Sequence, residues 1–380
     1  MWPLLTLAFG AFVAQTTEYL PIGLLPQIGA AFDVPKGLVG ALVTGYAWIA
    51  AISAIPLTLA TAHVGRRTLF LLLLAVITAA NALAAVTPNY LALAACRVVV
   101  ALTHGVFWSI LAAFATRVAP DMPPARATAW VFSGISAAVV GGVPLATALG
   151  QWVGWRVAFV AFSVLGVIAI VGGLAFLPPT EVTVGSGDGR LPRRNPVLYG
   201  AVVVTALSLT SHFCAYTFVL PVLDSVVGVP APILPVMLFV FGVAGIAGNA
   251  LGGWMSNRSR NAVSLALGGI LCAQIFMLLL GSRPAAGWFE MVVWGAAVSL
   301  LIVGLQGWVL EIAPERADAA SALYVTMFNI GIGSGALIGG VALERAGVAA
   351  VLYVAVLCGV ASLIVLALTV RLAGFHRKEA

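Results

Sequence analysis

The chain has 380 residues, of which 62% are hydrophobic and only 8% are charged, and its formal net charge is +6. A soluble globular domain has about 25% charged residues, so this chain cannot cover a water-facing surface. The composition therefore excludes soluble enzymes, nucleic-acid-binding proteins and disordered scaffolds. It predicts an all-helical protein that crosses a lipid bilayer many times.

Apolar runs bounded by charged residues, Pro or Gly predict twelve transmembrane helices, since a helix needs about 20 apolar residues to cross ~30 Å of hydrocarbon. The first run begins almost at Met1 without the positive segment of a cleaved signal peptide, so we expect it to be retained as a helix. The predicted helices cover residues 3–28, 37–61, 67–87, 90–117, 126–149, 155–177, 197–226, 231–256, 262–281, 287–312, 317–343 and 348–372.

The longest predicted loop, residues 178–196, is rich in Pro, Gly and Arg, which is typical of a flexible polar linker. It divides the chain into an N-terminal six-helix bundle (1–177), a linker (178–196) and a C-terminal six-helix bundle with a short tail (197–380). At an offset of 194 residues, three features of the first half recur in the second, which favours two parallel repeats. The pairs are Ala119-Pro120-Asp121 with Ala313-Pro314-Glu315, Gly65-Arg66-Arg67 with Ser259-Arg260-Asn261, and Glu18 with His212.

The positions of Lys and Arg predict the orientation, because cytoplasmic loops carry an excess of both. If both termini and the linker are cytoplasmic, 13 of the 18 cations lie on that side. The net charge is then explained by membrane topology and not by nucleic acid. The 13 residues are Arg66, Arg67, Arg117, Arg126, Arg190, Arg193, Arg194, Arg258, Arg260, Arg316, Arg371, Arg377 and Lys378.

Ionisable residues inside a span cost about 2.5–3.5 kcal/mol each, so they need a partner or an aqueous cavity. Glu18 is the one carboxylate deep in a predicted span, whereas Glu290 and Glu311 fall near helix ends, where they could reach the headgroups. A single carboxyl group whose surroundings alternate between apolar and cationic could load and release a proton. The alternative is a permanent Glu18–Arg97 ion pair that only fixes helix packing.

Arg97, Ala101, His104 and Trp108 recur at spacings of four, three and four residues, so they share one face of the fourth helix. An Arg, a His and a Trp on one face favour the lining of a hydrated, aromatic cavity, and a polar packing stripe is the alternative. We therefore predict Glu18, Arg97 and His104 as residues of proton coupling.

The candidates for substrate contact are polar or aromatic side chains inside spans. His212 and Tyr216 share a stripe on the seventh helix, while Tyr46 and the amides of Gln306 and Asn329 could equally serve helix packing. The predicted set is Thr17, Tyr46, Trp108, His212, Tyr216, Gln306 and Asn329.

Glycine is frequent, with 41 residues, and two of the predicted helices combine several glycines in a pattern of interest. Gly142 with Pro144 on the fifth helix, and Gly331 with Gly333 on the eleventh, let neighbouring helices approach closely. Because Pro144 also removes one backbone hydrogen bond, these helices could slide or rock. Simple close packing is the alternative.

No sequence pattern supports covalent chemistry, a cofactor or a metal site: HExxH, a P-loop and a dinucleotide fingerprint are all absent. We therefore expect no enzyme activity. Without a nucleotide site, uphill transport would have to draw on an ion gradient.

The chain resembles the major facilitator superfamily over its whole length. Gly65-Arg66-Arg67 resembles the end of the loop motif G-x-x-x-D-R-x-G-R-R, with Ala62 and His63 in place of its Asp and Arg. Arg97 matches the Arg of the helix-four motif that the family associates with proton coupling. The segment from Gly134 to Gly150, with Pro144, is similar to the helix-five motif of antiporters.

Three further segments resemble bacterial sugar efflux transporters of the B type, within the drug:proton antiporter branch: residues 16–21, 104–109 and 328–333. That resemblance implies a monomer in the bacterial inner membrane that exports small sugars by exchange for protons, with the helix-one acid, here Glu18, in proton exchange. Relatives that export chloramphenicol-like drugs or nucleosides leave those substrates open. A proton-coupled importer is a further alternative, and a non-transporting receptor or an intramembrane enzyme is disfavoured.

Overall fold

The computed structural model describes residues 1–61, 63–122, 124–179, 195–255, 258–280, 283–313 and 317–379. Within these ranges the regular structure is entirely helical, which confirms the predicted fold class. The predicted linker lies almost wholly outside the described residues. The elements of the first half are α1 (Trp2–Gly23), α2 (Leu25–Phe32), α3 (Lys36–Ala60), α4 (Arg66–Ala85), α5 (Tyr90–Val118), α6 (Pro124–Ala137), the π-helix η1 (Ala138–Gly142), α7 (Val143–Trp152) and α8 (Trp155–Phe176).

The second half contains α9 (Pro196–Tyr216), α10 (Val219–Ser225), the short 3-10 helix η2 (Ala231–Ile233), α11 (Leu234–Trp254), α12 (Ser259–Leu280), α13 (Pro284–Ile312), α14 (Ala317–Ala346) and α15 (Val348–Glu379). Each of the twelve predicted spans corresponds to one helix or to a run of consecutive helices. Helix is the expected form, because hydrocarbon offers the backbone no other hydrogen-bond partners.

Three of the predicted spans are interrupted, and each interruption lies near a proline. The α1–α2 break follows Pro21, Pro221 lies just after the α9–α10 break, and the π-helix η1 directly precedes the segment with Pro144. Proline lacks the N–H that would bond to the carbonyl four residues earlier, so the helix bends or changes its winding there.

Eleven helical stretches among the described residues are long and apolar enough to cross a membrane. Helix α1 is not among them, although it occupies the first predicted span. Four consecutive polar residues, Gln15 to Glu18, lie inside α1 and lower its hydropathy. All four are buried, so α1 is a helix with a polar segment that the protein encloses.

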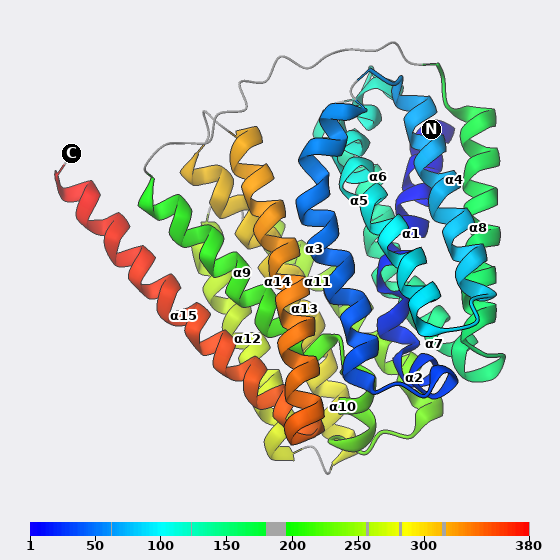
Figure 1. Ribbon diagram of the computed structural model, residues 1–380. Coiled ribbons are helices and arrows are strands. Elements are labelled where there is room, and N and C mark those ends of the chain that lie inside the picture. The colour runs from blue at the N-terminus through cyan, green and yellow to red at the C-terminus, as the bar shows by residue number, and fades with distance from the viewer. Residues whose placement is uncertain are drawn as a thin grey trace. The chain divides into compact units, whose positions relative to one another are not determined.

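The described residues form two compact units: Met1–Pro35 with Gly45–Gly185, and Lys36–Thr44 with Ser186–Ala380. In the first unit α1 packs against α6 and α8, and α4 lies beside α8, as Figure 1 shows. In the second unit α9 packs against α14 and α15, and α13 packs against α11 and α12. The start of α3 belongs to the second unit, where the Gly37 N–H donates to Glu344 Oε1 at 2.8 Å.

Glycines set the closest helix approaches. A Cβ atom at Gly134 of α6 would collide with the Ala8 carbonyl of α1, and one at Gly142 would collide with the Thr16 side chain. A Cβ atom at Gly248 of α11 would likewise meet the Ala296 carbonyl of α13. These pairs of helices therefore touch backbone to backbone, as small residues allow in membrane proteins.

We expect Gly248→Ala to destabilise the second unit by about 1–3 kcal/mol, because α11 and α13 must separate to admit one methyl group. Gly253→Ala on the same helix is the matched control, since nothing lies within 4 Å of its Cβ position. The thermal midpoint in detergent should fall for the first variant only. Equal midpoints would show that α11 does not pack tightly on α13 at this glycine.

Candidate functional site: a buried carboxyl network

The polar run of α1 is held by its own helix and by two neighbours. Pro21 has no N–H, so the Thr17 carbonyl, four residues earlier, lacks its intrahelical donor. Arg97 of α5 fills that vacancy: Nη1 donates to Thr17 O at 2.5 Å and Nη2 donates to Glu18 O at 2.7 Å. The guanidinium thus replaces a backbone hydrogen bond that Pro21 removed.

Arg97 binds the backbone of α1 and not the carboxylate of Glu18. No ion pair between the two side chains is present among the described residues, which differs from the permanent pair considered as an alternative. The Arg97 guanidinium also lies over the Tyr46 ring, with Cζ 4.4 Å from its centroid. Arg97 is therefore positioned by two carbonyls and one aromatic face, and its charge stays close to Glu18 without being cancelled by it.

The Glu18 side chain is only 6% exposed and has two polar neighbours. Gln15 Nε2 donates to Glu18 Oε2 at 2.7 Å, and His104 Nε2 lies 3.5 Å from the same oxygen. The structure thus brings Glu18, Arg97 and His104 together within the first unit, and their role in proton coupling stays a prediction.

His104 is held by two other side chains. Trp108 Nε1 lies 2.8 Å from His104 Nε2, and Tyr46 Oη lies 2.9 Å from Nδ1. The same Trp108 nitrogen lies 3.3 Å from His104 Nδ1. An indole N–H can only donate, so the shorter contact, at 2.8 Å, favours a lone pair on Nε2 and the proton of a neutral ring on Nδ1. In this arrangement Nε2 cannot donate to Glu18, which agrees with the longer 3.5 Å separation.

Two polar residues of this network, Gln15 and Asn81, were not predicted as site residues from the sequence. Asn81 of α4 is 1% exposed, and its Nδ2 donates to Thr17 Oγ1 at 2.9 Å. An amide in an otherwise apolar run was the available signal. The Thr17 hydroxyl, a predicted substrate contact, is fully buried and engaged with Asn81 in this conformation.

The second unit contains a cluster of buried rings around the predicted residues His212 and Tyr216. His212 stacks on Tyr216 with centroids 5.0 Å apart, and Tyr216 stacks on Phe241 at 5.1 Å. Trp294 of α13 stands nearly perpendicular to all three rings, and its Nε1 donates to His212 Nδ1 at 3.1 Å. Sequence reasoning missed Phe241 and Trp294, because nothing in the sequence shows which aromatic faces meet.

Neither predicted amide has a hydrogen bond to this ring cluster within the described part of the chain. Gln306 of α13 is exposed. Asn329 of α14 is buried, and its Nδ2 donates to Val325 O of its own helix at 3.0 Å, while its Oδ1 has no hydrogen-bond partner among the described residues. Asn329 therefore has one acceptor to spare for a ligand.

The predicted motif residues lie at helix ends or packing points. Gly65 precedes α4, whose first residues are Arg66 and Arg67, and Arg67 Nη2 donates to Leu174 O of α8 at 2.7 Å. Gly142 ends the π-helix η1 and faces Thr16 of α1, and Pro144 follows in α7. On α14, Gly331 lies against Leu209 and the Ala206 carbonyl of α9, and Gly333 is buried.

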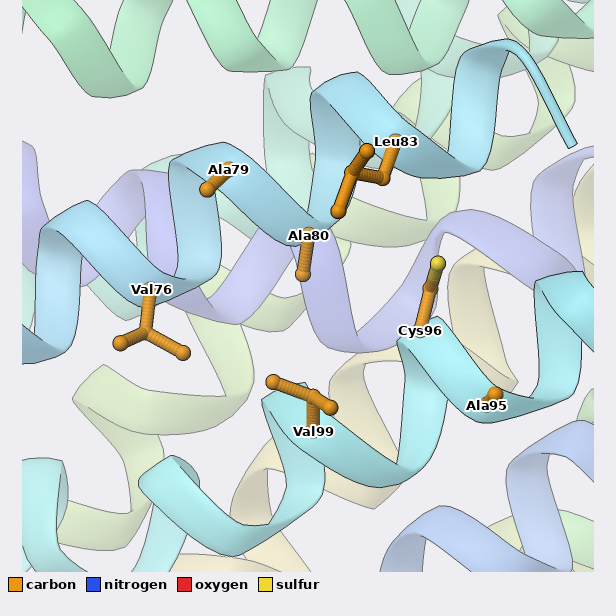
Figure 2. Close-up of a pocket in the computed structure, with 7 residues that line it drawn as sticks. All are labelled: Val76, Ala79, Ala80, Leu83, Ala95, Cys96 and Val99. Atoms are coloured by element: carbon orange, nitrogen blue, oxygen red, sulfur yellow. The ribbon is translucent and has the colours of Figure 1, made fainter.

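A groove of about 300 Å³ lies between α4 and α5. Figure 2 shows its lining, with Val76, Ala79, Ala80 and Leu83 on one side and Ala95, Cys96 and Val99 on the other. The lining offers no polar surface, so the groove suits hydrocarbon and not a hydroxyl-rich solute. The described residues also contain no group of three His, Cys, Asp or Glu that could hold a metal ion.

The family model of the Major Facilitator Superfamily matches residues 7–335. The chain belongs to this superfamily, whose members are membrane transport proteins. It is therefore a multi-pass membrane transporter and not an enzyme, and its substrate is a small molecule.

Solved structures show the same fold at low sequence identity. A bacterial homologue of the human lysosomal transporter Spinster, inward-facing and occupied, gives a TM-score of 0.76 at 16% identity, covering 97% of this chain and 96% of that one. A mutant of the nucleoside transporter NupG gives 0.74 at 13%, covering 97% and 99%. The human organic anion transporter MFSD10 gives 0.69 at 17%, covering 96% and 98%.

We expect Arg97→Met to destabilise the protein by about 1–3 kcal/mol, because it leaves the Thr17 carbonyl buried without a donor. Pro21→Ala should relieve part of that loss by restoring the N–H of residue 21. A double-mutant cycle on detergent unfolding should give a coupling of about 1 kcal/mol. Pro26→Ala, in the first turn of α2, is the control, and its effect on stability should add independently to that of Arg97→Met. Equal coupling of Arg97→Met to both proline variants would contradict the assignment.

Proposed function

We propose that this transporter is a proton-coupled antiporter that exports small sugars or related small molecules by alternating access. We place it in a bacterial plasma membrane as a monomer, with an N-terminal bundle (1–177), a cytoplasmic linker (178–196), a C-terminal bundle (197–380) and both termini in the cytoplasm. The observation that carries the proposal is the buried Glu18 carboxyl, which lies within reach of a histidine that is bonded elsewhere.

The Glu18 site supports proton exchange because its two protonation states need different partners. An ionised carboxylate in a buried site is costly unless a cation or donors compensate it. Gln15 supplies one donor to the carboxyl, whereas the Arg97 guanidinium donates to two backbone carbonyls. A proton on Glu18 satisfies the site as it stands, whereas its loss favours a new bond from His104.

His104 provides a link between proton and substrate. Its Nε2 accepts from Trp108 at 2.8 Å, and that bond excludes donation from Nε2 to Glu18. A substrate hydroxyl that takes the Trp108 N–H, or the Tyr46 hydroxyl, frees the ring to pair with Glu18. Substrate and proton then bias one another through a shared partner, as reciprocal coupling requires.

This arrangement favours substrates that combine hydroxyl groups with an apolar face. Trp108 and Tyr46 offer one N–H, one hydroxyl and two ring faces, and Tyr216, His212, Asn329, Gln306 and Thr17 are the further proposed contacts. Sugars and nucleosides both have this character, and the similarity to a nucleoside transporter keeps nucleosides as the second candidate. Gly142 with Pro144, Gly331 with Gly333, and Gly65 to Arg67 are the proposed gating elements.

Growth and accumulation measurements in cells distinguish between the candidate substrates and between export and import. An overexpressing strain should tolerate an exported toxic sugar analogue, nucleoside analogue or chloramphenicol-like antibiotic, with lower accumulation of that compound. Protection confined to nucleoside analogues or to antibiotics would select those alternatives. Increased sensitivity with higher accumulation would contradict export and establish import.

We expect Glu18→Gln to abolish uphill transport in proteoliposomes under an imposed proton gradient, because the amide keeps the shape but binds no proton. The measurement follows radiolabelled mono- and disaccharides, with radiolabelled nucleosides as a second panel. Glu311→Gln is the control, since Glu311 is exposed and accepts a bond from Ser259 at 2.6 Å, away from the network. Gradient-driven transport that survives Glu18→Gln unchanged would rule out Glu18 as the proton carrier.

A further inference from the structure

Helix α13 carries a second buried carboxyl that the proposed mechanism does not use. Glu290 is 1% exposed, and neither of its oxygens has a hydrogen-bond partner among the described residues. The sequence placed it near a helix end, from which the side chain could have reached the headgroups. The structure instead turns it into the second unit.

The neighbours of Glu290 on its own helix face apolar surroundings. One turn earlier, Gly287 faces the side chains of Val227 and Met237. Met291 and Trp294, next to it and one turn later, are fully buried. An ionised carboxylate without a partner in such a place costs many kcal/mol, so the group must be neutralised.

No charged side chain in the described part of the chain forms an ion pair with Glu290. Helices α9, α11, α12 and α14 pack against α13, and α11 has no titratable residue. Arg260, Cys272, Tyr199, Glu344 and Arg345 on the other three are exposed, as are Arg283 and Asp224 in the adjoining segments. The buried groups are engaged elsewhere: Cys214 with Val351 O, Tyr324 with Ile302 O, and His212 and Tyr216 in the ring cluster.

A metal ion does not fit this place as neutraliser. Hard cations need about six oxygen ligands, whereas the side chains around Gly287, one turn away, are hydrocarbon and no hydrogen-bonding group of the described residues reaches the Glu290 oxygens. A proton needs only the carboxylate itself. The chemistry of the surroundings therefore selects a proton as the ligand.

The two units also repeat one set of residue types. In the first unit a buried Glu18 accompanies a histidine that accepts an indole N–H and touches a tyrosine ring: His104, Trp108 and Tyr46. In the second unit His212, Trp294 and Tyr216 form the same trio, and Glu290 lies one turn from Trp294 on α13. The second unit thus repeats the carboxyl, histidine, indole and tyrosine of the first unit's site, but without a counterpart of Arg97 or Gln15 at its carboxyl.

We propose that Glu290 is a second proton-binding site, so that the transporter holds up to two protons, one in each unit. This inference rests on the proposed proton coupling and extends it. In the step, a proton from water forms an O–H bond with a Glu290 carboxylate oxygen and later returns to water, with no other bond changed.

The depth of Glu290 suits the entry of a proton. Helix α13 has 29 residues, so it is about 43 Å long, and Glu290 lies about 9 Å from its N-terminal end. In the proposed orientation that end of the tenth span faces the outside, where protons enter during export. Glu290 then lies just inside the ~30 Å hydrocarbon layer, within a short path of the source.

The test is infrared spectroscopy of the full chain in lipid nanodiscs at neutral pH, without substrate. The wild type should show carbonyl absorption from protonated carboxylic acids, to which Glu18 can also contribute. Glu290→Gln should remove the Glu290 component, and Glu290→Asp should retain that component at a shifted frequency. Glu311→Gln, on the same helix, should leave the band unchanged. Size-exclusion profiles and circular dichroism of each variant establish that it is folded.

An unchanged band in Glu290→Gln, or no protonated-acid band at any pH that Glu290→Gln removes, would overturn the proposal. Glu18→Gln in the same experiment keeps the two hypotheses apart. If Glu18→Gln abolishes gradient-driven transport while the Glu290 band is absent, only the second site is wrong. If transport survives Glu18→Gln while the Glu290 band is present, only the role of Glu18 is wrong.

Discussion

One unsatisfied carbonyl organises the polar site of this transporter. Hydrocarbon supplies no hydrogen-bond donors, so the Thr17 carbonyl that Pro21 deprives of its partner must find another within the protein. Arg97 supplies it and thereby fixes α5 to α1. The same contact brings His104, two turns further along α5, to within 3.5 Å of Glu18. Pro21, Arg97 and Glu18 are thus parts of one arrangement, in which a missing backbone hydrogen bond helps to position the Glu18 carboxyl.

The histidine of each unit is held in the same way, but the carboxyl groups of the two units differ in their hydrogen bonding. An indole N–H pins a histidine ring in both, through Trp108 in the first unit and Trp294 in the second. An imidazole that accepts such a bond stays neutral and leaves its other nitrogen to define what it meets next. In the first unit Gln15 donates one hydrogen bond to the Glu18 carboxyl, whereas in the second unit Glu290 has no hydrogen-bond partner among the described residues. Two proton sites of unequal surroundings would load and release in sequence and not together.

The sequence was sufficient for the helices and for the residues that share one helix face. Apolar run length predicts spans, and the spacing of Arg97, His104 and Trp108 placed them on one side of α5, where His104 and Trp108 do meet. Contacts between helices could not be predicted, because hydropathy does not tell which faces pack. Asn81, Phe241 and Trp294 were missed for that reason, and the burial of Glu290 was not foreseen. A permanent Glu18–Arg97 ion pair was the alternative considered, and the binding of Arg97 to the Thr17 carbonyl instead could be seen only once both helices were placed.

The most direct test of the proposed mechanism is the protonation state of His104, because the proposal links proton and substrate through its ring. Solid-state nitrogen-15 NMR of histidine-labelled protein, with His104→Asn to assign the signal, distinguishes the two neutral tautomers and the imidazolium. The account predicts a neutral ring with its proton on Nδ1 in the resting protein, and movement of that proton to Nε2 in Trp108→Phe. A resting ring protonated on Nε2, or a signal unchanged by Trp108→Phe, would contradict it.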